Sequence, residues 1–306
     1  MKIMVFDVGA TEIKYSVMDE QMHRTNSGAV PTPQDTQAQF LDAVYRLYAP
    51  HKDEVSGIAM ALPGFVDNRT GYVSNGGALL YNTATPVGQL LAEKCGCPVI
   101  LENDGKAAAM AELANGALKD CCNAAVFIIG TGVGGGIIAN GQLVRGVHFT
   151  AGEYSFVNTN AEAWDAPDQN MACQCSTSNL LKWYRARKAL PEDAPLDGRS
   201  FFAAANAGEP EALEVLRRFC HAVAVQIYNL TVLLDVEKVA IGGGISKQPL
   251  LLESLRSAYD GLYASRAGQA YMEGLPRCQI VPCAFSSEAN QVGVAAAYFE
   301  AMQKKC

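Results

Sequence analysis

A glycine-rich hairpin in the middle of the chain constrains the fold more than any other feature. Residues 124–129 form an apolar run typical of a buried strand, and five glycines follow within residues 130–136. A second apolar run ends at Asn140-Gly141, a dipeptide favoured in type I′ hairpin turns. Glycines lack a Cβ, so their backbone N–H groups can approach one anion. We therefore interpret this segment as a phosphate-binding turn made by Gly130, Thr131, Gly132 and Gly134.

The same segment also satisfies the spacing of a dinucleotide-binding motif. Gly130, Gly132 and Gly135 follow the pattern G-x-G-x-x-G. That motif requires a helix directly after the glycines, so that the helix N-terminus faces the pyrophosphate. Residues 137–144 predict a strand and a turn instead. The context therefore favours a phosphate-binding hairpin over an NAD site.

The N-terminal segment repeats the central pattern. Residues 5–11 align with residues 126–132, and in both places a second apolar run and a turn follow. An internal repeat of about half the chain predicts two domains of like topology that face one cleft. The alternative is a chance likeness, because any strand–glycine–strand unit resembles another.

Length and composition agree with two domains. A chain of 306 residues exceeds the usual size of a single core, and 49% hydrophobic with 18% charged residues is ordinary for a globular protein. We expect a small α/β domain from residues 1–117, to which residues 288–306 return as a helix. Residues 118–287 are expected to form a larger α/β domain.

Charge and cysteine content exclude several classes of protein. A net charge of −7 argues against a general nucleic-acid surface, which would be basic. No apolar stretch reaches the roughly 20 residues that a membrane span requires, and no secretory signal is recognised at the N-terminus. Ten cysteines are too sparse for a disulfide scaffold. We expect a cytoplasmic protein with reduced thiols that binds neither nucleic acid nor a membrane.

Asp7 interrupts the apolar run of the first predicted strand, residues 2–8. A carboxylate in such a place is costly unless it meets a cation or hydrogen-bond donors. With Gly9, Thr11 and Lys14 it forms the pattern Asp-x-Gly-x-Thr-x-x-Lys. One interpretation is that Asp7 faces a hydrated Mg²⁺ at nucleotide phosphates, with Gly9 and Thr11 beside the phosphate chain. The other is a strand-end Asp that closes a turn, with a solvated Lys14.

Two further segments follow predicted strands of the first half. Gly64 lies in the loop after a strand at residues 55–62, and Asn75, Gly76 and Gly77 form a polar turn that could meet sugar hydroxyls or be a plain turn. Asn103 and Asp104 lie where a strand at residues 98–102 ends and an alanine-rich helix at residues 106–118 begins. The positive end of a helix dipole favours an ionised carboxylate, as a general base needs. The alternative is that one of the two residues is only an N-cap.

The second half offers two more candidate segments. Glu153 is an isolated acid that could accept hydrogen bonds from sugar hydroxyls or be an ordinary surface residue. Gly242, Gly243 and Gly244 follow a strand at residues 238–241, and we interpret them as the adenosine side of the site. The remaining expected elements are helices at residues 33–49, 86–94, 180–188, 209–234, 249–259 and 287–302, a strand at 279–284 and a loop at 158–170.

Taken together, the motifs make the chain resemble the ROK family (repressors, open reading frames and kinases) of the actin-like, hexokinase-type ATPases. The motifs are Asp7-x-Gly9-x-Thr11-x-x-Lys14, Pro63-Gly64-x-Val66-Asp67, Asn103-Asp104 with Ala107-Ala108 and Glu112, Gly130-Thr131-Gly132-x-Gly134-Gly135-Gly136, Asn140-Gly141-x-Leu143-x-x-Gly146, Ala151-Gly152-Glu153 and Gly242-Gly243-Gly244-Ile245-Ser246.

The resemblance implies two RNase H-like domains and ATP-dependent phosphorylation of a hexose hydroxyl, usually the 6-OH. Asp104 would accept the proton of that hydroxyl, while Asn103 and Glu153 would hold other sugar hydroxyls. Asp7 and the two glycine hairpins would position Mg·ATP. Such transfer depends mainly on alignment and charge stabilisation. The resemblance also suggests a homodimer.

The chain departs from the zinc-bearing members of that family. Those members have a histidine where this chain has Phe156, and a third cysteine after a Cys-x-Cys pair. Here Cys173-x-Cys175 is followed by residues 176–180, Ser-Thr-Ser-Asn-Leu. Two sulfurs make a poor tetrahedral site, so we expect no zinc.

Members that resemble β-glucoside kinases lack the zinc segment and carry a stretch like Asn75-Gly76-Gly77, so we expect a β-glucoside or β-linked disaccharide as substrate. The alternatives are a glucokinase, a fructokinase, an N-acetylmannosamine kinase, or a sugar sensor without catalysis. Repressors of the family carry a helix-turn-helix before the Asp-x-Gly strand, and we expect none here because that strand starts near the first residue.

Overall fold

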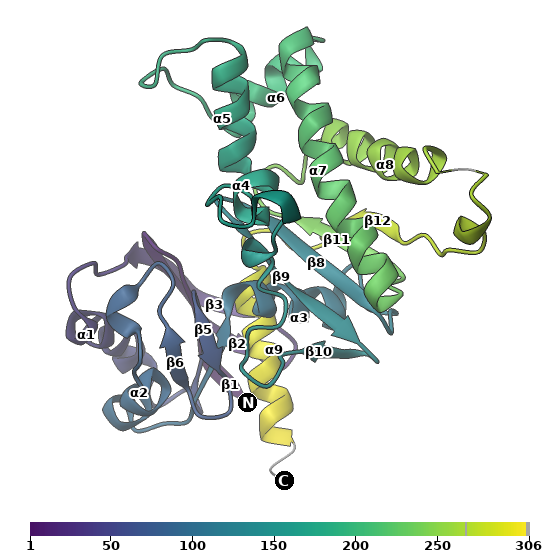
Figure 1. Cartoon of the computed structure of the whole chain (residues 1–306). Helices are drawn as coiled ribbons and strands as arrows, with labels where there is room; N and C mark the ends of the chain where they lie inside the picture. The colour runs from purple at the N-terminus through teal and green to yellow at the C-terminus, as the bar shows by residue number, and fades with distance from the viewer. Residues whose placement is uncertain (267, 304–306) are drawn as a thin grey trace. The chain divides into compact units, whose positions relative to one another are not determined.

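The computed structural model describes residues 1–266 and 268–303 as a mixed α/β protein with two five-stranded sheets (Figure 1). The chain divides into two compact units. The first contains Met1–Gly116, Leu143–Ala151 and the described residues from Ser287 on, and the second contains Ala117–Gln142 and Gly152–Ser286. The predicted boundaries assigned residues 143–151 to the second domain, whereas Leu143–Ala151 belong to the first unit here. The division into domains stays a prediction.

The two sheets have the same topology, which explains the internal repeat in the sequence. Each begins with an antiparallel hairpin. The first strand of the hairpin then pairs in parallel with a third strand, which pairs in parallel with a further strand at the edge of the sheet. The first sheet has the order β3-β2-β1-β4-β7 and the second the order β10-β9-β8-β11-β12. The strands of the first sheet are β1 (Lys2–Val8), β2 (Glu12–Asp19), β3 (Arg24–Pro31), β4 (Ile58–Leu62) and β7 (Val99–Asn103). Those of the second are β8 (Ala124–Ile129), β9 (Val133–Ala139), β10 (Gln142–Val144), β11 (Lys238–Gly242) and β12 (Gln279–Pro282).

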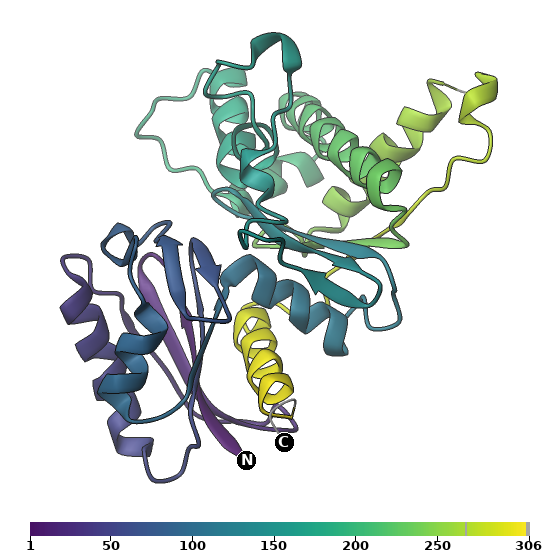
Figure 2. The ribbon, with the colours of Figure 1, turned by 60° about the horizontal axis from the view of Figure 1, so that its bottom comes forward.

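Helices cover both faces of the first sheet, as Figure 2 shows. They are α1 (Gln37–Tyr48), α2 (Val87–Cys95), α3 (Asp104–Asn115) and α9 (Ala289–Gln303). The pair α1 and α2 lies on one face, and α9 lies on the other, against β1, β4 and α3. Because helices cover it on both sides, β1 is buried along its whole length after Lys2.

The second unit packs its helices around α7 (Pro210–Leu234). This helix starts with a proline at its first turn and ends at Asp235, which has a left-handed φ of 48°. It contacts the other helices of the unit, which are α4 (Met171–Cys175), α5 (Thr177–Arg187), α6 (Gly198–Asn206) and α8 (Pro249–Ala264). One apolar core joins these helices to the strands β8 and β11. In the part of the chain that the structure describes, no helix has the length and apolar character needed to cross a membrane.

Several local predictions are confirmed and several are wrong. The central glycines join two antiparallel strands, which confirms the hairpin over the dinucleotide motif, and Asn140 and Gly141 have the positive φ of its far turn. The predicted loop after β4 instead contains the hairpin of β5 (Phe65–Asp67) and β6 (Tyr72–Asn75). Residues 191–199 were expected to be a connector, but helix α6 begins at Gly198, and it was missed, as were the edge strand β3 and the short helix α4. The first predicted helix begins later than expected, because Thr36 caps it.

Helices α3 and α9 approach each other closely at Gly293. Both helices are rich in alanine and buried almost all round, and a Cβ on Gly293 would overlap the carbonyl group of Ala107. Only a glycine fits there without moving one helix.

Gly293→Ala is therefore expected to lower the free energy of unfolding by about 1–3 kcal/mol, because an added methyl group must displace α3 or α9. Gly261→Ala is the matched control, since nothing lies within 4 Å of its added Cβ in helix α8. The control should change stability by less than about 1 kcal/mol, in the stabilising direction. Denaturant unfolding measures both, and equal values for the two variants would contradict the packing constraint.

Candidate active site

The predicted site residues fall into one set in each unit. The first unit contains the Asp7 hairpin, the Gly64 and Asn75–Gly77 turns and the Asn103–Asp104 turn. The second contains the Gly130–Gly134 hairpin, Glu153 and the Gly242–Gly244 turn. In both units these segments follow strands of a sheet, where ligands bind in α/β proteins.

Asp7 is a buried carboxylate with two polar partners. It pairs with Lys14 across the antiparallel β1–β2 ladder, and the Lys14 Nζ lies 3.9 Å from Asp7 Oδ2. The Asn290 amide at the start of α9 donates to Asp7 Oδ1 at 2.9 Å. Burial raises the pKa of Asp7 above its ordinary value of 3.8, although the Asn290 hydrogen bond and the Lys14 charge act in the opposite direction. The buried carboxylate thus has both a hydrogen-bond donor and a nearby cation, and either one lowers the cost of burying it.

The β1–β2 turn holds Gly9 and Thr11. The Gly9 N–H donates to the Glu12 carbonyl at 2.9 Å, and Thr32 fixes the turn from β3's end by donating its hydroxyl to the Gly9 carbonyl at 2.8 Å. Gly9 and Thr11 are both exposed. Sequence reasoning missed Thr32 and Asn290 as supports of this turn, since neither belongs to a local motif.

Within the first unit, the residues predicted to hold sugar come together around Gly64. This glycine has φ +96°, and a Cβ there would overlap the Asn75 carbonyl. The Asn75 side chain accepts from the Gly77 N–H at 2.8 Å and so closes its own turn, while Thr83 accepts from the Gly76 N–H at 3.0 Å. The Asn103 amide donates to the Gly64 carbonyl at 3.0 Å. The structure therefore joins these turns, and it also gives Asn75 a structural hydrogen bond.

The sequence left open which of Asn103 and Asp104 caps the helix that follows them. Asn103 is the N-cap of α3, and its side-chain oxygen accepts from the Lys106 N–H at 3.0 Å. Asp104 is the first helical residue and accepts from the Gly105 N–H at 2.7 Å. Its half-buried carboxylate thus lies at the N-terminus of a 12-residue helix. A helix N-terminus favours a negative charge, and the role of Asp104 as a general base stays a prediction.

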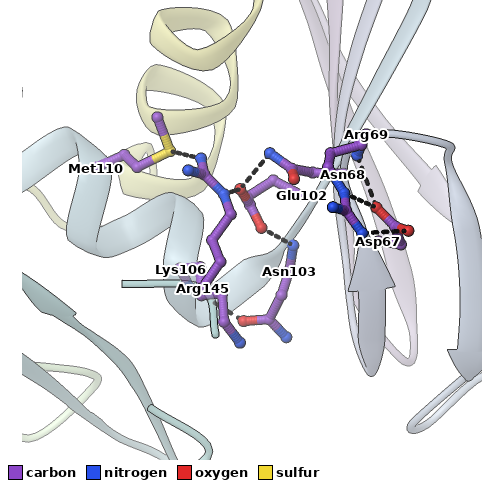
Figure 3. Close-up of polar contacts among 8 residues, drawn as sticks. All are labelled: Asp67, Asn68, Arg69, Glu102, Asn103, Lys106, Met110 and Arg145. Carbon is purple, nitrogen blue, oxygen red and sulfur yellow. Dashed lines mark hydrogen bonds and ion pairs between the residues drawn. The ribbon is translucent and has the colours of Figure 1, made fainter. Parts of the chain in front are cut away.

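Glu102, which directly precedes this turn, was missed by sequence reasoning. Its side chain is fully buried and accepts from Arg145 Nε at 2.8 Å and from its neighbour's backbone N–H at 3.0 Å (Figure 3). Burial raises the pKa of Glu102, and the Arg145 charge opposes that shift. The signal for it in the sequence was a carboxylate at the end of an apolar strand, as at Asp7.

In the second unit the two glycine turns lie side by side. Gly242 pairs with Ile128 in the parallel ladder of β8 and β11. Gly243 has φ +97°, and a Cβ there would overlap the carbonyl of Ile129, the residue before the Gly130 turn. The Gly130 N–H is bonded to the Gly132 carbonyl at 3.0 Å. Thr131 is exposed at the tip of this turn and Gly134 is exposed on β9, whereas Gly244 is exposed in the neighbouring turn.

The segment that carries Glu153 is fixed to the β8–β9 hairpin. Tyr154 donates its hydroxyl to the Gly136 carbonyl at 3.1 Å, and its ring meets Phe127 edge-on at 4.5 Å. The Ser155 hydroxyl accepts from the Val133 N–H at 3.0 Å. Glu153 is half-buried, and the two residues that follow it bond to β9, the second strand of the Gly130–Gly134 hairpin.

A cavity of ≈ 400 Å³ adjoins the tip of the Gly130 turn. Hydrogen-bonding groups and two cations line it, and Arg218 stacks on Trp183 at 3.8 Å from the ring centre. The polar and charged lining residues are Thr131, Asp168, Gln169, Gln174, Ser176, Ser178, Asn179, Lys182 and Arg218, so that two cations face one carboxylate. This chemistry suits an anionic ligand. No spacing in the sequence identifies it, because the lining comes from the turn after β8, the loop before α4, and the helices α4, α5 and α7.

The segment that differs from zinc-bearing relatives has few features of a metal site. Phe156 is 71% exposed, and Cys175 is buried in the apolar core, where burial raises the pKa of its thiol to about 12. Cys173 directs its thiol to the Pro167 carbonyl at 3.7 Å. A thiol that resists ionisation is a poor zinc ligand.

Comparisons with known proteins agree with the motifs. The ROK family pattern matches residues 3–303. The chain is 30% identical to a β-glucoside kinase of Listeria innocua, over 84% of this chain and 87% of that protein. It is also 30% identical to an N-acetyl-D-glucosamine kinase of Vibrio atlanticus, over 82% of this chain and 86% of that one. A crystal structure of a ROK family protein from Streptococcus pneumoniae, in complex with sucrose, has a TM-score of 0.87 at 27% identity, over 99% of this chain and 100% of that one. The chain belongs to the ROK family.

Proposed function

We propose that this protein is an ATP-dependent sugar kinase that phosphorylates the 6-hydroxyl of a β-glucoside or β-linked disaccharide. The observation that carries this proposal is Asp104 at the first position of α3, with Asn103 as its N-cap and the Gly64 turn bonded to Asn103. A carboxylate held at a helix N-terminus beside polar turns suits the removal of a proton from a bound hydroxyl.

The roles follow from the chemistry of each segment. Asp104 accepts the proton of the attacking hydroxyl, while Asn103, Glu153 and the turn of Gly64 and Asn75–Gly77 hold other hydroxyls of the sugar. The β1–β2 turn, with Gly9, Thr11 and Lys14, and the Gly130–Gly134 turn orient the phosphate chain. Gly242–Gly244 face the adenosine, and the cavity at Thr131 provides further room for the nucleotide.

Asp7 is the residue that fits a magnesium ion. It is a buried carboxylate whose cationic neighbour, Lys14, lies at the long distance of 3.9 Å. A hydrated Mg²⁺ would therefore lower the free-energy cost of burying the negative charge. The ion, when bound, neutralises charge on the phosphates. Asp7 would hold it through water, and Asn290 keeps the carboxylate oriented.

Similarity to named kinases supports a sugar as the substrate. The residues at which this chain differs from zinc-bearing members of the family narrow the choice of sugar. The β-glucoside kinase of Listeria innocua and the N-acetyl-D-glucosamine kinase of Vibrio atlanticus are each 30% identical to this chain. The ROK structure with sucrose shows that a disaccharide binds to a protein of this fold. An exposed Phe156 in place of a histidine, together with the Asn75-Gly76-Gly77 turn, favours a glucosyl unit that carries an aglycone or a second sugar.

The second candidate is another hexokinase of the family, such as a glucokinase, a fructokinase or a kinase of an N-acetylated hexosamine, and the third is a sugar sensor without turnover. By the same family resemblance we expect a homodimer in the cytoplasm.

An ADP-release assay over a panel of sugars tests the substrate. We expect cellobiose, gentiobiose and aryl β-glucosides to give the highest kcat/KM, at least about 10-fold above glucose, because the extra ring adds contacts that glucose lacks. N-acetylglucosamine, N-acetylmannosamine and fructose complete the panel. A higher kcat/KM for any of these three than for cellobiose would replace the β-glucoside assignment.

Asp104→Asn tests the assigned base. We expect kcat to fall by about 10²–10⁴-fold, because the amide cannot accept the proton, while the fold and sugar binding are kept. The circular dichroism spectrum and the thermal midpoint should match those of the wild-type protein. Glu93→Gln, on the exposed side of α2, is the control and should retain full turnover. A fully active Asp104→Asn variant would refute the assignment.

Asp7→Asn is expected to raise the thermal stability in EDTA at neutral pH and to lower turnover with Mg·ATP. Because the pKa of Asp7 is raised on folding, the fold favours its protonated form. Asp7 therefore costs no stability below its ordinary pKa, and the cost grows as the pH rises through the raised value. The thermal midpoints of variant and wild type should coincide in acid and separate toward neutral pH. Coincident midpoints at pH 7, or undiminished turnover, would show that Asp7 has neither role.

A further inference from the structure

A buried charge cluster lies directly behind the Asn103–Asp104 turn (Figure 3). Its centre is Glu102, whose side chain has no exposed surface. One carboxylate oxygen accepts from the Asn103 N–H at 3.0 Å, and the other accepts from Arg145 Nε at 2.8 Å and from the Asn68 amide at 3.4 Å. The carboxylate therefore links the backbone of the proposed catalytic turn to an arginine far away in the sequence.

Arg145 belongs to a segment that returns to the first unit. The residues Leu143–Ala151 belong to this unit although the chain on both sides of them belongs to the other. The Arg145 side chain also lies 3.5 Å from the Met110 sulfur on α3, and its carbonyl accepts from the Ala151 N–H at 3.2 Å. Ala151 stands two positions before Glu153 in the sequence. Arg145 thus bonds through its side chain to Glu102, the residue before the Asn103–Asp104 turn, and through its backbone carbonyl to Ala151.

We propose that Arg145, acting through Glu102, is a positioning residue that sets the orientation of the Asn103–Asp104 turn for phosphoryl transfer. The proposal rests on the function proposed above. Arg145 acts on the Glu102 carboxylate more strongly than the other nearby cation, Lys106. Without Arg145 the buried carboxylate takes up a proton or draws in water more readily, and either change alters its bond to the Asn103 N–H. The Asn103 side chain caps α3 and holds the Gly64 carbonyl, so a shift of this residue moves the proposed base and the sugar-binding turn together.

The arginine is suited to this role for a geometric reason. Its guanidinium donates to Glu102 through Nε and reaches the Met110 sulfur through Nη2, so two directions of the planar group are fixed at once. A lysine supplies the charge at one point only. The positive charge at residue 145 therefore supplies part of the positioning, and the planar guanidinium group supplies the rest.

Arg145→Met is the principal test, and Arg69→Met is its matched control. Arg69 stacks on Phe149, 4.6 Å from the ring centre, so it anchors the same 143–151 segment without contact to Glu102. We expect Arg145→Met to lower kcat on the order of 10²-fold with an unchanged KM for ATP, because a displaced base slows transfer more than nucleotide binding. Arg145→Lys should restore part of kcat, and Arg69→Met should keep it.

Hydrogen exchange provides a readout that does not depend on turnover. The amides of Asn103 and Lys106, which bond to Glu102 and Asn103, should exchange faster in Arg145→Met and at the wild-type rate in Arg69→Met. If the wild-type protein phosphorylates none of the sugars, the proposed function fails, and this readout alone decides on the positioning role.

A double variant tests whether Arg145 acts through Glu102. The double variant Glu102→Gln with Arg145→Met should have a kcat no lower than that of the slower single variant, because both substitutions break the same link between Arg145 and the Asn103–Asp104 turn. Three results would overturn the proposal: additive losses in the double variant, equal losses in Arg145→Met and Arg69→Met, or an Arg145→Met protein with lower thermal stability and normal kcat and exchange.

Discussion

Close contact between backbone segments at glycine is the constraint on which the rest of the structure depends. Gly293 brings α9 against α3, Gly64 brings the Asn75 turn against the loop after β4, and Gly243 brings its turn against the end of β8. In each case a Cβ would occupy the place of a carbonyl group, so the segments could not meet. Two of these contacts lie at proposed ligand-binding turns, and the third packs the helix that begins with Asp104.

Compensation of buried charge is the second requirement, and it is met by partners far away in the sequence. Asp7 on β1 meets Asn290 on α9, and Glu102 on β7 meets Arg145 after β10. A buried carboxylate without such partners would destabilise the fold by several kcal/mol or become protonated. Each pairing therefore fixes the place of a distant segment: α9 behind the first hairpin, and residues 143–151 behind the Asn103–Asp104 turn.

The sequence predicted the features that depend on local chemistry. The glycine hairpins, the repeat and the strand–helix junction at Asp104 are local patterns of period, turn residues and polarity, and the structure has each of them. It could not predict Asn290, Arg145 or the cavity at Thr131, because each depends on segments that are brought together only by folding. The missed elements follow the same rule. Strand β3 is mostly polar and exposed and is held by pairing with β2, and the β5–β6 hairpin is held by its register.

The strand–helix junction also shows that a structural and a catalytic interpretation need not compete. An N-cap has to place its own side chain against the first turn of the helix, which fixes the backbone of the next residue. Asn103 does this with one amide atom and holds the Gly64 carbonyl with the other. Asp104 is then left at the positive end of the helix, where its carboxylate is stabilised. An Asp in the cap position itself would spend an oxygen on the Lys106 N–H. Separation of the two tasks between neighbouring residues keeps the cap and the proposed base from competing for the same atoms.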